Sequence, residues 1–85
     1  MDAEALLRRF FEAQGAKALP ADRESFLAVR FLDQGLIDSL GIIALISEIE
    51  SGCAIRFTAD DLESYEFQSI GGLLGLIERH RKAGG

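Results

Sequence analysis

Apolar residues recur with helical spacing in three segments of this 85-residue chain, and this pattern constrains the fold more than any other feature. Similar stripes occur within residues 2–17 and 69–82, but the clearest lies in residues 39–53. That stripe follows i, i+3, i+4, i+7 and i+11, and consists of Ile42, Leu45, Ile46, Ile49 and Cys53. The pattern predicts three amphipathic helices, over about residues 2–17, 39–51 and 69–82.

The long connection between the first two helices carries signals of ordered structure. Pro20 prevents a simple continuation of the first helix, and Asp22 to Ser25 could start a short helical turn. The residues Asp33-Gln34-Gly35 are typical of a turn. Five apolar residues are too many for a free linker, and we expect them to pack beneath the helices as an ordered loop: Phe26, Leu27, Val29, Phe31 and Leu32.

Shorter signals complete the expected fold. Gly52 is predicted to stop the second helix, residues 54–58 to form a loop, and residues 59–63 to form one helical turn. Ser69 is a suitable N-cap for the last helix. The sequence therefore predicts an all-α fold, a small antiparallel bundle of three to four helices with a long ordered loop between helices one and two.

The length and composition limit the class of protein. A chain of 85 residues buries too little surface for a large internal catalytic cleft. No apolar run reaches the roughly 18 residues that span a bilayer, and the acidic start lacks a signal-peptide pattern. The single Cys53 cannot form an internal disulfide and is expected in the core. We expect a soluble, cytoplasmic, monomeric protein forming one domain over residues 1–85, with an ordered core over about 2–82.

The charge of the chain is concentrated in its middle. The net charge is −5, but residues 33–66 carry eight acidic residues against one arginine, a net charge of −7. Such a surface repels nucleic acid and steers toward basic protein partners, although acidic residues also simply keep a small domain in solution. We expect no nucleic-acid partner and no insertion into a membrane.

Ser39 stands where the loop meets the second helix, and its role decides the function. A catalytic serine needs a base and an oxyanion hole, but the only histidine, His80, lies at the far end of the last helix, where we expect it to be solvated. A helix cap is the second possibility, but Asp38 can perform the same capping, which would leave the Ser39 hydroxyl free. The third possibility is the attachment of a prosthetic group.

Leu40 and Ile43 flank this serine. Ile43 lies one helical turn after Ser39 and off the centre of the core stripe, so we expect it in a partly exposed docking patch. Leu40 fits either this patch or a broad buried face, and the pattern favours the buried face.

Residues 31–40, Phe-Leu-Asp-Gln-Gly-Leu-Ile-Asp-Ser-Leu, resemble the signature of acyl carrier proteins and peptidyl carrier domains. In that family an Asp-Ser-Leu triplet opens the second helix, and its serine carries a 4′-phosphopantetheine arm through a phosphodiester. Ile49-Glu50, Phe57 with Asp60-Asp61-Leu62, and Phe67 to Ile70 resemble later parts of the family pattern. The resemblance extends over nearly the whole chain.

The resemblance implies a role for each residue of the motif. Ser39 would be the attachment site, and Asp38 would help a phosphopantetheinyl transferase to recognise it. Leu40 and Ile43, with the acidic Glu48 and Glu50, would dock partner enzymes. The arm would come from coenzyme A, and its thiol would hold an acyl or aminoacyl group as a thioester. The chain would be no enzyme, but a non-catalytic carrier that serves transferases, acyl- or aminoacyl-activating ligases, and acyltransferase or synthase enzymes.

The chain also departs from the carriers of fatty acid synthesis. Gly41 and Ala44 stand where those carriers usually have acidic residues. The Gly35 to Gly41 segment is more similar to stand-alone D-alanyl or aminoacyl carrier proteins and to specialised carriers. The main alternative function is a small helical protein–protein interaction domain without a prosthetic group, in which Ser39 is only a cap.

Overall fold

The computed structural model describes residues 2–14, 19–33, 35 and 37–84 of the chain. Within these residues the fold consists of helices without strands, which confirms the predicted all-α class. The helices are α1 (Ala3–Ala13), α2 (Arg23–Leu27), α3 (Ser39–Cys53), α4 (Ala59–Glu63) and α5 (Ile70–Gly84). The predicted end of the first helix, residues 15–17, lies outside the described residues. None of the described helices is long and apolar enough to cross a membrane.

Side chains just before the helices explain where α1 and α2 begin. The Asp2 carboxylate accepts the Ala5 N–H at 3.2 Å at the start of α1. The Asp22 carboxylate accepts the Ser25 N–H at 2.9 Å, which confirms the short helical turn predicted there. This hydrogen bond lowers the pKa of Asp22. Such caps satisfy backbone donors that have no partner in the first turn.

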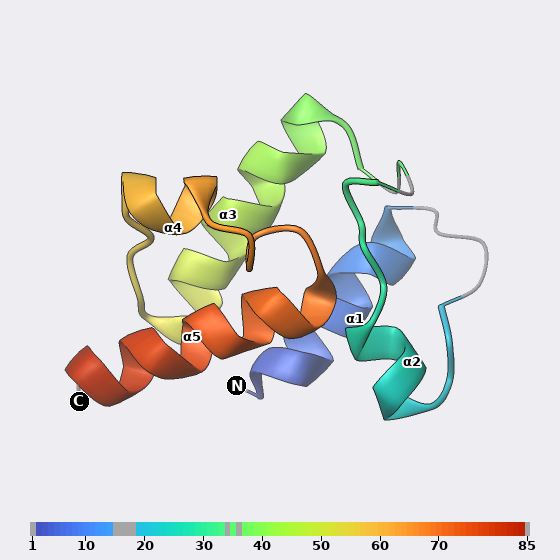
Figure 1. The fold of residues 1–85 in the computed structure, drawn as a ribbon, viewed down its shortest axis with the longest axis horizontal. Coiled ribbons are helices and arrows are strands. Elements are labelled where there is room, and N and C mark those ends of the chain that lie inside the picture. The colour runs from blue at the N-terminus through green and yellow to red at the C-terminus, as the bar shows by residue number, and fades with distance from the viewer. Residues whose placement is uncertain (1, 15–18, 34, 36, 85) are drawn as a thin grey trace.

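The three long helices form the bundle (Figure 1). α1 packs against α3 and α5, and α3 packs against α5, while the short α2 packs against α5. Edge and tilted contacts between phenylalanine rings join the helices to the connecting loops, through Phe11, Phe31, Phe67 and Phe57. Fully buried leucine and isoleucine side chains of α3 and α5 complete the core: Leu45, Ile49, Ile70, Leu73, Leu76 and Ile77.

The described residues of the long connection, 19–33, 35 and 37, form an ordered part of the fold, as predicted. Phe26, Val29 and Phe31 are buried, and Leu27 packs against the core, but Leu32 is 37% exposed. The expectation that all five apolar residues pack beneath the helices was therefore wrong for Leu32. The chain turns at Gly35, whose φ of 65° favours glycine.

Hydrogen bonds hold this connection against the start of α5 and the loop before it. The Ile70 N–H donates to the Val29 carbonyl at 2.9 Å. Arg30 donates to Asp33 at 2.5 Å, to the Tyr65 hydroxyl at 3.1 Å and to Gln68 at 2.8 Å. The segment that leads to Ser39 is thus held from the opposite end of the sequence.

α3 ends later than predicted. It continues through Gly52 to Cys53, and the residue in the left-handed conformation is Ala54, with φ of 56°. A Cβ at Gly52 would lie 2.4 Å from Leu6 Cδ1 of α1, so the Leu6 side chain would have to shift to admit one. The prediction of Gly52 as a stop signal was wrong, because the helix continues past it and Ala54 takes the left-handed conformation in its place.

Candidate functional site

The start of α3 places Asp38 and Ser39 in different roles. Asp38 is the N-cap, and its Oδ1 accepts the Gly41 N–H at 2.8 Å. Its carbonyl oxygen accepts the Ile42 N–H at 2.9 Å, which starts the ladder of helical hydrogen bonds. Ser39 is the first residue of the helix. Of the two capping arrangements that the sequence allowed, the structure has the one in which Asp38 caps.

The capping by Asp38 leaves the Ser39 side chain available. Ser39 is exposed, and its hydroxyl makes no hydrogen bond with any residue that the structure describes. By contrast, the Ser64 hydroxyl donates to the Asp61 carbonyl at 2.7 Å, and the Ser69 oxygen accepts the Gly72 N–H at 3.0 Å. A helix start that exposes a free hydroxyl is open to an enzyme that modifies it.

The surroundings of Ser39 suit a phosphate group. α3 has 15 residues, and its first turn contains no acidic residue. The N–H groups and the dipole at the start of a helix favour a negative charge there. The Asp38 carboxylate beside Ser39 is engaged with the Gly41 N–H. A phosphodiester on the exposed Ser39 oxygen therefore fits this position.

Two large apolar side chains lie exposed beside this serine. Leu40 is 76% exposed and Ile43 is 64% exposed. The exposure of Ile43 was expected, but the predicted burial of Leu40 was wrong. The first turns of α3 extend away from α1 and α5 (Figure 1). The buried residues of α3 are Gly41, Leu45, Ile49 and Cys53, and Leu40 does not belong to this buried stripe. Two exposed apolar side chains within one helical turn form a small patch that a partner protein could cover.

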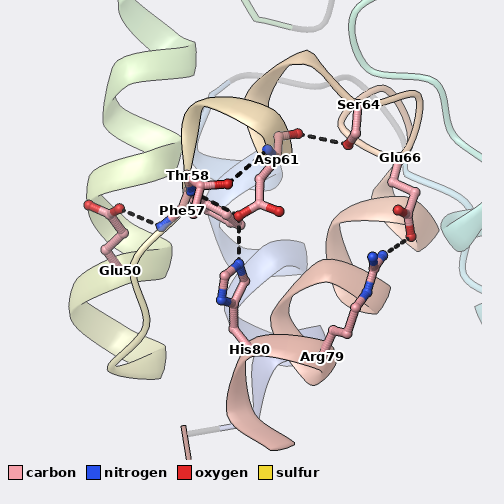
Figure 2. A network of polar contacts seen from close by, with 8 residues as sticks. All are labelled: Glu50, Phe57, Thr58, Asp61, Ser64, Glu66, Arg79 and His80. Atoms are coloured by element: carbon pink, nitrogen blue, oxygen red, sulfur yellow. Dashed lines mark hydrogen bonds and ion pairs between the residues drawn. The ribbon is translucent and has the colours of Figure 1, made fainter. Parts of the chain in front are cut away.

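The two acidic residues of α3 have different environments. Glu48 is exposed and borders a groove of about 410 Å³ between α1 and α3, which Leu6 and Phe10 also line. Glu50 is half-buried, and its carboxylate accepts the Phe57 N–H at 3.0 Å (Figure 2). Glu50 thus has a structural contact in addition to its predicted role in docking.

A polar network attaches α4 to the rest of the fold (Figure 2). α4 buries none of its own residues. Thr58 and Asp61 form a reciprocal capping box, with hydrogen bonds of 3.1 and 2.8 Å. Asp61 also contacts His80 Nε2 of α5 at 2.6 Å, and Glu66 pairs with Arg79. Polar contacts, more than apolar burial, therefore hold α4.

His80 thus differs from its predicted solvated state. Its side chain is 26% exposed, contacts Asp61, and packs edge-on against the Phe57 ring. Burial raises the pKa of Asp61, but the Thr58 and His80 hydrogen bonds outweigh it and hold the pKa below its ordinary value. The structure confirms the helical turn predicted at residues 59–63, and the Thr-x-x-Asp spacing of the capping box is a further sequence signal for its start.

Among the described residues, no three His, Cys, Asp or Glu side chains lie close enough together to hold a metal ion. The predicted site residues gather at the start of α3, apart from Glu48 and Glu50, which lie two to three turns further along the helix. The site therefore consists of an exposed hydroxyl, a carboxylate cap and a small apolar patch.

Comparison with known proteins gives one finding. The family model described as the phosphopantetheine attachment site matches residues 16–77, which include Ser39 and more than half of the chain. No curated protein and no solved structure matches the chain. The match confirms the resemblance found in the sequence. The chain belongs to the family of phosphopantetheine-attachment proteins, carriers whose prosthetic group is a covalently attached 4′-phosphopantetheine.

Proposed function

We propose that Ser39 is the residue that carries 4′-phosphopantetheine, and that the chain presents acyl or aminoacyl groups on this arm to partner enzymes. The observation that carries the proposal is the exposed Ser39 hydroxyl, which has no hydrogen-bond partner among the described residues, at the start of a helix that Asp38 already caps. Ser47 and Ser51 are also exposed, but Ser47 lies in the middle of α3 and Ser51 in its last turn, so neither lies at the N-terminus of the helix.

The division of chemistry between protein and prosthetic group follows from this arrangement. The Ser39 oxygen would form the phosphodiester bond as the pyrophosphate bond of coenzyme A breaks. Adenosine 3′,5′-bisphosphate would leave, and a base of the transferase would take the hydroxyl proton. The start of α3 stabilises the negative charge of that phosphodiester. When bound, the prosthetic group supplies a thiol that holds the cargo as a thioester. The chain itself acts as a tether that raises the effective concentration of the cargo at each partner.

Among the residues that the structure describes, none makes a hydrogen bond with the Ser39 hydroxyl that could activate it. His80 is engaged with Asp61 and lies in the C-terminal half of α5, far from the start of α3 (Figure 1). We therefore propose a non-catalytic carrier whose residues 1–85 act as one domain. Membership of the attachment family favours this function over an interaction domain without a prosthetic group.

The surface beside Ser39 supports docking of partner enzymes. The exposed Leu40 and Ile43 provide apolar contacts, and Glu48 and Glu50 add negative charge along the same helix. We propose that a phosphopantetheinyl transferase, an acyl- or aminoacyl-activating ligase, and an acyltransferase or synthase use this surface in turn. Basic residues on these partners would complement the charge of −7 in residues 33–66.

Mass spectrometry of the intact protein tests the attachment. The apo protein is incubated with coenzyme A and a transferase of broad specificity. We expect the wild type to gain the mass of one phosphopantetheine group, and Ser39→Ala to gain none. Ser47→Ala, which changes an exposed serine of the same helix, is the matched control and should be modified like the wild type. A wild type that stays unmodified by a transferase active on another carrier contradicts the proposal.

A further inference from the structure

Gly41 is a buried glycine in the first turn of α3. A Cβ at this position would lie 2.9 Å from Ile37 Cβ and 3.4 Å from Asp38 Oδ1. Ordinary contact begins at 3.4 Å, so Ile37 would have to move by at least 0.5 Å to admit a methyl group. The absence of a side chain at Gly41 therefore allows Ile37 to lie close over the start of the helix.

This glycine has no conformational reason to be in its position. Glycine is a poor helix former, and Gly41 does not have the positive φ that favours glycine at Gly35. Gly75 of α5 provides a contrast, because the nearest atom to a Cβ there is 3.8 Å away. The space that Ile37 occupies thus explains the glycine at position 41.

The contacts of Gly41 lead directly to Ser39. Ile37 packs against the core and immediately precedes Asp38, whose carboxylate accepts the Gly41 N–H at 2.8 Å. A displacement of Ile37 or of the Asp38 carboxylate therefore changes the direction in which the backbone enters α3. Ser39 is the next residue, so its hydroxyl moves with this entry.

We propose that Gly41 is a positioning residue for modification, which fixes the Ser39 hydroxyl by leaving room for Ile37. The inference rests on Ser39 as the attachment site. It also gives a physical reason for the lack of an acidic residue at position 41, since any side chain there would meet Ile37. In this carrier an apolar contact of Ile37 fixes the start of α3, and position 41 has no acidic side chain beside the serine.

Modification kinetics of the full apo chain test this role. In Gly41→Ala we expect kcat/KM for phosphopantetheine transfer to fall about tenfold or more, because small misplacements of a reacting atom have large effects on rate. The loss should appear in kcat, with the KM for coenzyme A unchanged. Gly75→Ala is the matched control, a helical glycine with open space, and its kcat/KM should stay within about twofold of the wild type.

A second background separates positioning from a general loss of structure. Ile37→Gly removes the Cβ that the new methyl group would meet, so adding Gly41→Ala to Ile37→Gly should change kcat/KM by less than about twofold. The proposal is overturned if Gly41→Ala alone keeps the wild-type rate, or if it slows both backgrounds equally. If Gly41→Ala alone does not fold, the comparison within the Ile37→Gly background decides.

Amide NMR spectra of the apo protein distinguish this inference from the proposed function. A wild type that is not modified contradicts Ser39 as the attachment site, but it leaves the geometry of Gly41 testable. We expect Gly41→Ala to shift the amide signals of Asp38 and Ser39, and Gly75→Ala to leave them unchanged. Unshifted signals in Gly41→Ala would show that Gly41 does not position this segment.

Discussion

Replacement of Asp38 with alanine removes the N-cap of α3, and we predict a loss of about 1–2 kcal/mol in the free energy of unfolding. The magnitude follows from the local geometry. The Asp38 carboxylate accepts the N–H of the buried Gly41 at 2.8 Å, where water replaces the lost acceptor poorly. The lost negative charge at the helix start contributes roughly 0.3–1 kcal/mol of this total. For a chain of this size the melting temperature should fall by roughly 4–15 °C.

Urea and thermal unfolding measure this loss, and two variants serve as controls. Asp38→Asn keeps a side-chain oxygen at the cap and should retain most of the stability. Asp2→Ala removes the same kind of cap from α1, where the hydrogen bond is 3.2 Å long and exposed, and should have a smaller effect. Asp38→Ala should also slow the modification of Ser39, whereas Asp2→Ala should not. An Asp38→Ala protein with the urea midpoint of the wild type would refute the capping argument.

Three further predictions concern the surface, the packing and the pH dependence. Ile43→Asp should slow modification without unfolding, because Ile43 is 64% exposed; lost helicity in circular dichroism would instead place it in the core. Gly72→Ala should destabilise by about 1–3 kcal/mol in urea, since its Cβ would lie 2.0 Å from a backbone oxygen, while Gly75→Ala should not destabilise; equal effects would contradict this packing. Because the pKa of Asp61 is lowered in the folded chain, its contribution is present above the unfolded value and is lost as the pH falls through the folded value. The free energy of unfolding should therefore decline less steeply below roughly pH 4 in Asp61→Asn, and His80→Gln should reduce the same decline to a smaller extent. An unchanged pH profile of stability in Asp61→Asn would contradict the network.

The helices could be predicted from the sequence because their signals are local. The stripe from Ile42 to Cys53 predicted α3, and Asp22 and Ser39 marked helix starts within one residue. The same locality made the capping by Asp38 foreseeable, since a cap involves residues three positions apart. The free Ser39 hydroxyl followed from that cap.

The features that could not be predicted depend on contacts between distant segments. Gly52 meets Leu6 of α1, and His80 meets Asp61, and neither contact leaves a signal in the local pattern. The predictions that depended on local patterns were therefore correct, and the errors concern residues whose environment depends on tertiary packing.

Fragmentation of the modified peptide tests the central claim most directly. Digestion of the modified wild-type protein after arginine releases residues 31–56, which contain Ser39, Ser47 and Ser51. The fragment masses of this peptide assign the added group to one of the three serines. We predict that the phosphopantetheine mass lies on Ser39 alone. Its assignment to Ser47 or Ser51, or its absence from this peptide in a modified protein, would contradict Ser39 as the attachment site.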